Sequence, residues 1–177
     1  MLAEFYQEAT EKLFADLKIN RLALPRVEKV LVSVGLGPNI GNKEIVESIE
    51  KELALITGQK PKKTTAKKSI SGFKIRQNQH IGFLVTLRGK RMWQFIYKLI
   101  NIVYPRIRDF DGIPTKSIDT GGNLNIAIRE QLVFPEIKPD EIKATWGMTI
   151  TLSLNKNTKV DVAKNYYTNL GFIFKEL

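Results

Sequence analysis

The 177-residue chain contains no cysteine and only one histidine, His80. The lack of cysteine excludes disulfide bridges, thiolate nucleophiles, cysteine-based zinc sites and iron–sulfur clusters. One histidine is too few for a histidine metal cluster or a catalytic triad, and no nucleophile–base arrangement is evident elsewhere. The sequence therefore predicts a protein that is not an enzyme and that holds no metal and no cofactor.

Long apolar runs are also missing. No stretch approaches the roughly 18 apolar residues of a membrane-spanning helix, and the first residues lack the basic and apolar pattern of a secretory signal. A lipid-binding helix with lysines and arginines on its polar face is not evident either. We expect a cytoplasmic protein without a membrane partner, folded as a single domain over residues 1–177 with 43% hydrophobic composition.

The most informative absence is that of acidic residues between positions 53 and 108. No aspartate or glutamate occurs there, whereas thirteen lysines and arginines do. The chain has a formal net charge of +10, yet the residues outside this stretch include 15 basic and 18 acidic side chains. Because a solvated basic surface is usually balanced by nearby acids, the one-sided block favours a polyanionic partner, and nucleic acid in particular.

The glycines at 35, 37 and 41 superficially resemble a phosphate-binding loop between a strand and a helix. Their spacing is G-x-G-x-x-x-G with a proline inside, whereas the dinucleotide fingerprint requires G-x-G-x-x-G and a later acidic residue. The segment fails the Walker pattern as well. We interpret it as a tight turn.

The spacing of apolar residues, together with capping residues, glycines and prolines, predicts the helices and strands of the fold. Apolar and β-branched residues at 27–34 predict a strand, and Asn42 and Gly58 bracket a helix as its N-cap and its C-terminal glycine. Further strands are expected after Pro61 and at 81–87, 124–128 and 148–154, and further helices at 3–17, 90–103 and 158–170. In the helix at 90–103, which Pro105 should end, the expected inner face consists of Met92, Phe95, Ile96, Leu99, Ile102 and Val103.

This order of elements predicts the α+β class. We expect a mostly antiparallel β-sheet with helices packed on one face, as an RNP-like sandwich with a long basic loop. The other face of the sheet would then be free. Two long exposed loops are expected, the basic one at about 67–80 and another at 109–123.

The basic region favours RNA over DNA. Its lysines can contact phosphates, and the neutral polar residues among them can contact sugars or base edges. The sequence shows no zinc ligands, heptads or basic recognition helix, and the strand at 81–87 has only Phe83 as a stacking aromatic. Recognition of a folded RNA by its shape and backbone is therefore expected, with an RNA chaperone or another nucleic-acid-binding module as the alternative.

Five strings, taken together, carry a resemblance to a known family. They are GQKP at 58–61, AKKSISGFKIR at 66–76, VTLRG at 85–89, PRIRDF at 105–110 and EQLVFPEI at 130–137. Their order and spacing closely resemble the bacterial form of large-subunit ribosomal protein five, and the similarity covers almost the whole chain.

The resemblance implies a structural constituent of the large ribosomal subunit that binds 5S rRNA and anchors it in the central protuberance. It implies as partners 5S rRNA, neighbouring large-subunit rRNA, other central-protuberance proteins, the P-site tRNA and a small-subunit head protein. The loop at 109–123 is our choice for the bridge to that head protein. The resemblance implies rRNA contacts at Ser33, Gln59, Thr86 and Arg88. The basic residues Lys60, Lys62, Lys63, Lys90 and Arg91 are expected to bind rRNA as well. The implied tRNA-contacting loop residues are Lys67, Lys68, Ser69, Ser71, Gly72, Phe73, Lys74 and Arg76.

The chain departs from the family pattern at three positions. Ser33 stands where asparagine is usual, Asp111 where a basic residue is common, and Trp146 where arginine is common. Each change bears on a peripheral rRNA contact.

Overall fold

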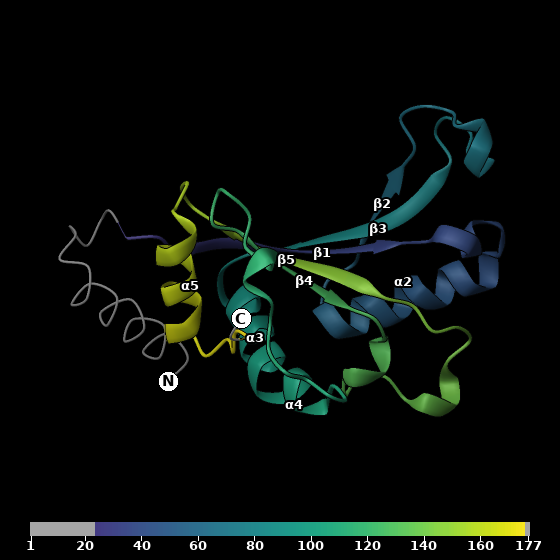
Figure 1. Ribbon diagram of the computed structural model, residues 1–177. Coiled ribbons are helices and arrows are strands. Elements are labelled where there is room, and N and C mark those ends of the chain that lie inside the picture. Colours follow the sequence, from purple (N-terminus) through teal and green to yellow (C-terminus); the bar gives the residue numbers. More distant parts are fainter. Residues whose placement is uncertain (1–23, 176–177) are drawn as a thin grey trace. The chain divides into compact units, whose positions relative to one another are not determined.

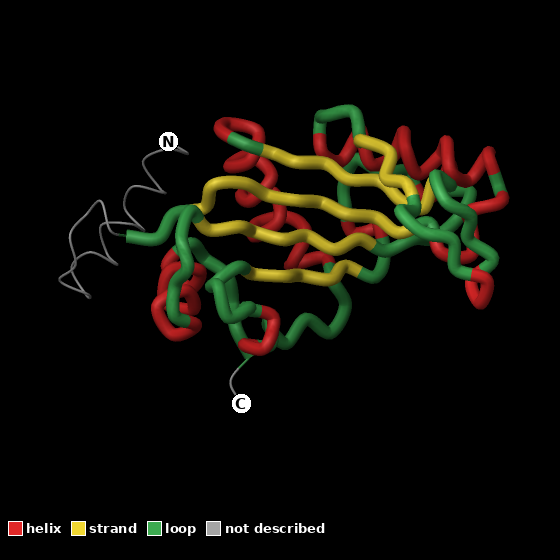
Figure 2. The backbone as a smooth tube through the Cα atoms, turned by 90° about the horizontal axis from the view of Figure 1, so that it is seen from above, coloured by secondary structure: helices red, strands yellow, loops and turns green. Residues whose placement is uncertain are grey.

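The computed structural model describes residues 24–175 (Figure 1). The expected opening helix at 3–17 lies outside this range. Five strands form one sheet in the order β2-β3-β1-β5-β4, in which they lie side by side (Figure 2). Short 3₁₀ turns occur at Gly37–Gly41, Ser71–Phe73, Thr115–Ser117, Gln131–Val133 and Pro139–Glu141. The main elements are β1 (Val27–Gly35), α2 (Lys43–Thr57), β2 (Lys62–Thr65), β3 (His80–Leu87), α3 (Gly89–Lys98), α4 (Tyr104–Arg106), β4 (Leu124–Ile128), β5 (Met148–Leu154) and α5 (Val160–Asn169).

The antiparallel α+β class predicted from the sequence is confirmed. In β2 and β3, for example, Lys62 pairs with Leu84 and Thr64 with Gly82, in opposite directions. A register shift follows Thr64, since Thr65 pairs with His80. The expected strands at 124–128 and 148–154 match β4 and β5 in full.

The described residues group into two compact units. Unit 1 comprises residues up to 30, 87–126 and from 151 onward, and unit 2 comprises 31–86 and 127–150. Strands β1, β4 and β5 contribute residues to both. The sequence prediction of a single domain stays a prediction.

In unit 2, α2 packs along one side of its strands (Figure 1). Asn42 caps the helix as predicted, because its Oδ1 accepts hydrogen bonds from the backbone N–H groups of Glu44 and Ile45. Gly58 ends it with a left-handed φ of 64°. The apolar side of α2 is buried with the inward residues of the strands, which include Val32, Val34, Ile49, Leu53, Ile56, Phe83 and Val85.

A buried polar network attaches the segment 131–146 to α2. Glu52 is buried, and its carboxylate accepts hydrogen bonds from Ser48 Oγ at 2.7 Å and Trp146 Nε1 at 2.8 Å. Gln131, which is fully buried, accepts from Trp146 N at 2.9 Å and donates to Ala144 O at 2.8 Å. Trp146 therefore supplies two neutral donors to this network.

In unit 1, an aromatic cluster closes the core. Tyr104 stacks on Phe110 with ring centroids 4.7 Å apart and meets Phe172 edge-on at 6.0 Å. Tyr167 donates a hydrogen bond from its hydroxyl to Gly122 O at 3.0 Å. Burial raises the pKa of Tyr167 well above its ordinary value. These rings stay neutral and act as packing residues.

The prediction for the helix at 90–103 is wrong at its end. The helical path continues from α3 through a π turn at Leu99–Val103 into α4, and Pro105 lies inside α4. Tyr104 N donates to Leu99 O, five residues back, so the turn is wider than in an α-helix. This wider turn accommodates the proline ring and its missing N–H. It also rotates Ile102 outward to 39% exposure, whereas Val103 stays buried.

We predict that Trp146→Phe lowers the free energy of unfolding by about 2 kcal/mol, because it removes a donor from the buried Glu52 carboxylate. Urea denaturation measures the change. In a Glu52→Gln background the same substitution should cost less, since a neutral amide is less costly to leave unpaired. Strictly additive costs in this double-mutant cycle would contradict the proposed coupling.

Candidate nucleic-acid interface

The solvent face of the strands in unit 2 is lined by small polar side chains. On β1, valines 30, 32 and 34 are buried, so that Ser33 and Gly35 point to the opposite, exposed side. On β5 the same alternation exposes Thr149 between Met148 and Ile150. Ser33 Oγ donates to Thr149 O at 3.4 Å, which makes these two residues neighbours. At these positions of β1 and β5 the face thus presents uncharged hydroxyl groups.

Gln59 and Thr86 lie next to each other in unit 2. Gln59 directly follows the C-cap of α2, and its Nε2 donates to the backbone oxygen of Thr86 at 3.3 Å. Both side chains are half-buried. The structure thus brings together two predicted site residues that are 27 positions apart, and it uses one amide proton of Gln59 to hold them.

The lysines of β2 and the segment before it differ in their environment. Lys60 and Lys62 are exposed, with no acidic partner among the described residues. Lys63 instead forms an ion pair with Glu50 of α2, with Nζ 3.1 Å from Oε2. The Lys63 side chain is 59% exposed and that of Glu50 20%. The stretch from 53 to 108 contains no acid, but the fold brings Glu50 from outside it next to Lys63. The charge of Lys63 is therefore partly neutralised.

The predicted basic loop, residues 67–80, connects β2 to β3 and extends past the ends of both strands (Figure 1). At its base, Ala66 N donates to Gln79 O and Asn78 N donates to Ala66 O, both at 2.9 Å. Farther out, Ile70 and Ile75 form an isolated antiparallel bridge. Backbone bonds at two levels thus fix the path of the loop.

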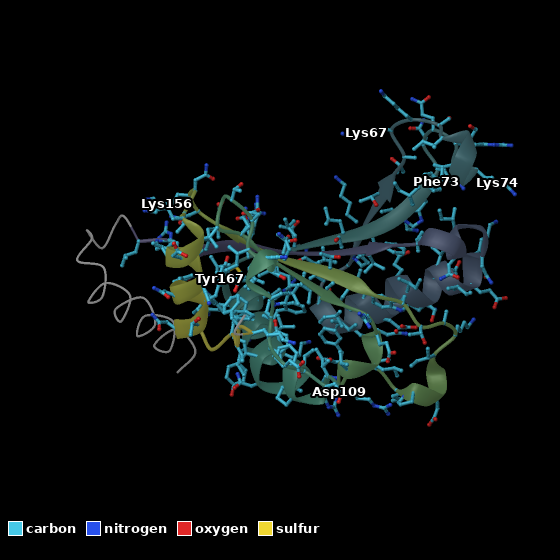
Figure 3. All side chains as sticks on the ribbon, in the orientation of Figure 1. Lys67, Phe73, Lys74, Asp109, Lys156 and Tyr167 are labelled. Atoms are coloured by element: carbon cyan, nitrogen blue, oxygen red, sulfur yellow. The ribbon has the colours of Figure 1, made fainter. Side chains whose placement is uncertain are left out.

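The tip of the basic loop exposes one aromatic ring among cations. Phe73 is 76% exposed and lies near Lys74, whereas Lys67 is on the part of the loop that leaves β2 (Figure 3). Lys74 has a left-handed φ of 54°, which closes the tip. Every predicted tRNA-contacting residue is exposed: Lys67, Lys68, Ser69, Ser71, Gly72, Phe73, Lys74 and Arg76.

In unit 1, the remaining predicted rRNA-binding residues gather where α3 begins. Arg88 is the N-cap of α3, and Lys90 and Arg91 lie in its first turn. All three side chains are exposed. No acidic residue occurs in that turn, and no side chain caps it. The start of α3 is therefore a local concentration of positive charge.

The loop at 109–123, also in unit 1, is built around Asp119. Its Oδ1 accepts from Gly121 N at 2.9 Å and Asn123 N at 2.8 Å, and its Oδ2 accepts from Asn123 Nδ2 at 2.9 Å. Partial burial raises the pKa of this carboxyl, but hydrogen bonds from Asn123, Gly121 and Gly122 lower it more. Its pKa thus lies below the ordinary value of 3.8.

The C-terminal tail supports the first half of the same loop. Ile113 N donates to Ile173 O at 2.8 Å, and Lys175 N donates to Ile113 O at 2.9 Å. Asp111, one of the departures from the family pattern, forms an ion pair with Lys175 at 3.1 Å. This acid therefore has a partner within the chain.

Residues 24–175 contain no metal site, no membrane-spanning helix and no phosphate-binding loop of the kinds considered from the sequence. They contain no group of three or more metal-ligating side chains. No helix in this range is both long and apolar enough to cross a membrane. The segment 35–41 leads into a helix whose first N–H groups are already occupied by Asn42, as expected for a turn rather than a phosphate cradle.

Comparisons with known proteins agree on one family. A family model described as "Ribosomal protein L5" matches residues 20–76, and a second model, which describes the C-terminus of the same ribosomal protein family, matches residues 80–174. A protein named "Large ribosomal subunit protein uL5" from Pseudothermotoga lettingae is 43% identical over 173 residues, covering 97% of this chain and 94% of that protein. The protein of the same name from Halothermothrix orenii is 47% identical over 160 residues, with 89% of each chain covered.

We predict that Asp119→Ala destabilises the protein at pH 7 and that this difference fades in acid. The folded-state pKa is depressed, so the contribution of the carboxylate is present above about pH 3.8 and is lost as the pH falls through the lower folded value. Urea denaturation from pH 7 to pH 3 measures it, with the exposed Asp140→Ala as control. A difference between Asp119→Ala and wild type that does not change with pH would contradict the role of the charge.

Proposed function

The chain belongs to the ribosomal protein L5 family, and from that premise we propose that it binds 5S rRNA and contacts the P-site tRNA. Members of this family are structural constituents of the large ribosomal subunit and not enzymes. Their place is the ribosome in the cytoplasm. The family resemblance inferred from the sequence is thereby confirmed, and the contacts below are the proposal.

The 5S rRNA surface that we propose in unit 2 has a neutral centre and a basic margin. Ser33, Gln59 and Thr86 supply hydroxyl and amide groups, while Lys60 and Lys62 supply charge. Lys63, also a predicted contact, instead faces α2 and is paired with Glu50. Hydroxyl and amide groups suit riboses and phosphates, and no described residue of this face exposes an aromatic ring that could stack on splayed bases. The chemistry supports recognition of a folded RNA by its backbone.

Unit 1 contributes rRNA contacts of its own in this proposal. Arg88, Lys90 and Arg91 are all exposed at the start of α3, where no acidic residue balances them. Cations in such a cluster suit the phosphates of rRNA.

Thr149 belongs to the same proposed surface of unit 2, although the sequence interpretation did not name it. Its position opposite Ser33 follows from the pairing of β1 with β5. The strict alternation of buried and exposed residues at 148–154 was the available signal, but it required knowing that β1 and β5 are neighbours.

Gly35 is the single observation that best supports close approach of RNA to this face. A Cβ on Gly82 would lie 2.6 Å from Val34 O, and one on Gly147 would lie 2.9 Å from Ile128 O. Both positions therefore require glycine, because any side chain would clash with the neighbouring backbone. At Gly35 a Cβ would meet nothing within 4 Å, and its φ is not left-handed. Glycine weakens a strand, and where packing does not require it, a closely approaching ligand is a common reason.

We predict that Gly35→Val leaves the fold intact and weakens binding of purified protein to a 5S rRNA transcript at least tenfold, roughly 1.4 kcal/mol. The added side chain would separate the RNA backbone from the strand. Filter binding gives the affinity, and circular dichroism verifies the melting temperature. Gly41→Val is the matched control, since that glycine also has open space around it but lies outside the sheet. Equal affinity of Gly35→Val and wild type would rule out close approach at this strand.

For the basic loop, we propose contact with the P-site tRNA. Its four cations suit phosphates, and its backbone bonds hold Phe73 outward at the tip, where a ring can stack on a nucleobase or ribose. The loop at 109–123 is our proposal for the bridge to the small-subunit head, supported by exposed side chains such as Asp111 and Lys116 and by the hydrogen bonds of Asp119 that shape it.

We predict that ribosomes carrying Phe73→Ala release P-site tRNA at least five times faster, because a stacked base contributes about 1–3 kcal/mol. Dissociation of labelled tRNA measures the rate. Phe73→Trp should retain slow release. Leu55→Ala, which removes another highly exposed apolar side chain, should have no effect. If Phe73→Ala and wild-type ribosomes release tRNA at the same rate, the aromatic contact is wrong.

A further inference from the structure

The outer face of α3 carries a row of exposed polar residues. Lys90, Gln94 and Tyr97 follow one another at intervals of four and three, which places them on one side of α3. Asn101, in the π turn that follows, continues the row, because its Nδ2 donates to Tyr97 O. Arg91 is exposed beside them. The row is roughly 16 Å long at 1.5 Å per residue. The sequence interpretation considered only the inner, apolar face of this helix.

The charge pattern of this face differs from that of the other described long helices. On α2, exposed Lys43, Glu47 and Lys51 alternate in sign at intervals of four, as is typical of a face in contact with solvent. The first turn of α2 contains Glu44, and that of α5 contains Asp161. The first turn of α3 contains two cations and no acid, and none follows before Asp109.

These cations stand where the helix itself disfavours them. The N-terminal end of a helix carries partial positive charge, which acidic residues normally offset. Arg88, Lys90 and Arg91 add to that charge, and no side chain caps the end. A negatively charged partner on this face would relieve the repulsion.

Tyr97 adds an aromatic surface to the same row. Its side chain is 46% exposed, so the core does not need all of it. Asn101 Nδ2 donates to Tyr97 O at 3.0 Å, which holds the amide close to the base of the ring. Cations can contact phosphates, amides can bond to sugars or base edges, and an exposed ring can stack on a base. The outer face of this helix offers all three kinds of group.

We infer that the outer face of α3 binds a segment of ribosomal RNA, with Lys90 and Arg91 on phosphates and Tyr97 against a base or ribose. The inference rests on the proposed function, because Lys90 and Arg91 are among its proposed rRNA contacts, and extends it to Gln94, Tyr97 and Asn101. RNA is favoured over a protein partner because the face has three cations at its start and no acid.

The absence of cysteine makes a direct test possible, since Gln94→Cys introduces a unique thiol for a benzophenone maleimide. Large subunits that contain the labelled protein are irradiated, and the crosslinked species is identified. Asn165→Cys on the mixed-charge α5 is the control. We expect crosslinks to rRNA from position 94 and few from position 165. Crosslinks from 94 to a protein only, or none in subunits that contain the chain, would overturn the inference.

A second measurement keeps the test decisive if the label prevents incorporation. Gln94→Glu adds an acid four residues after Lys90, which restores the pattern of a solvated helix. We expect an unchanged or higher melting temperature and at least fivefold weaker binding to deproteinised large-subunit rRNA. Asn165→Asp makes the same charge change on α5 and should alter binding less than twofold.

The outcomes separate the two proposals. Equal weakening by Gln94→Glu and Asn165→Asp, or by neither, would refute a specific role for α3 while leaving the proposed function in place. Failure of the wild-type chain to bind rRNA at all would instead refute the proposed function.

Discussion

The buried side of the strands is the constraint on which the rest of the structure depends. In β1, valines fill alternate positions and must be covered, and in unit 2 the apolar side of α2 provides that cover. Because side chains alternate along a strand, burying the valines commits Ser33 and Gly35 to the opposite side. The polar face is thus a direct result of core packing. The composition of the proposed RNA surface therefore depends on which residues of β1 are buried behind it.

Much of the fold could be predicted because local signals and final packing agreed. Asn42 and Gly58 mark the ends of α2 by hydrogen bonding and backbone conformation, which are local properties. Strands β4 and β5 were predicted in full because both alternate strictly and are bounded by turns. The helix at 90–103 failed at its end because the π turn before Pro105 changes the phase of the inner face, and helical spacing alone does not contain that information.

The candidate site was harder to predict from the sequence, because it is formed by residues that are far apart along the chain and meet only in the fold. That Thr149 lies beside Ser33 follows only from strand order, and the pairing of Lys63 with Glu50 only from the packing of β2 near α2. Tyr97 was not predicted as a contact residue, because the periodicity of apolar residues identifies only the inner, buried side of a helix. Counting charge along the chain therefore identified a basic region but did not reveal that Lys63 is paired with an acid from outside it.

The π turn at Leu99–Val103 has a further meaning for comparing relatives. Such a turn holds one residue more than a regular helix needs, so it is equivalent to an insertion absorbed without forming a loop. A chain one residue shorter here could close an ordinary helix, and because the π turn absorbs the extra residue, every later helical position would keep its orientation. Tyr104 would keep its stack on Phe110 and its edge contact with Phe172. A single-residue gap at this point in a relative thus indicates a regular helix in place of the π turn, with the aromatic cluster unchanged.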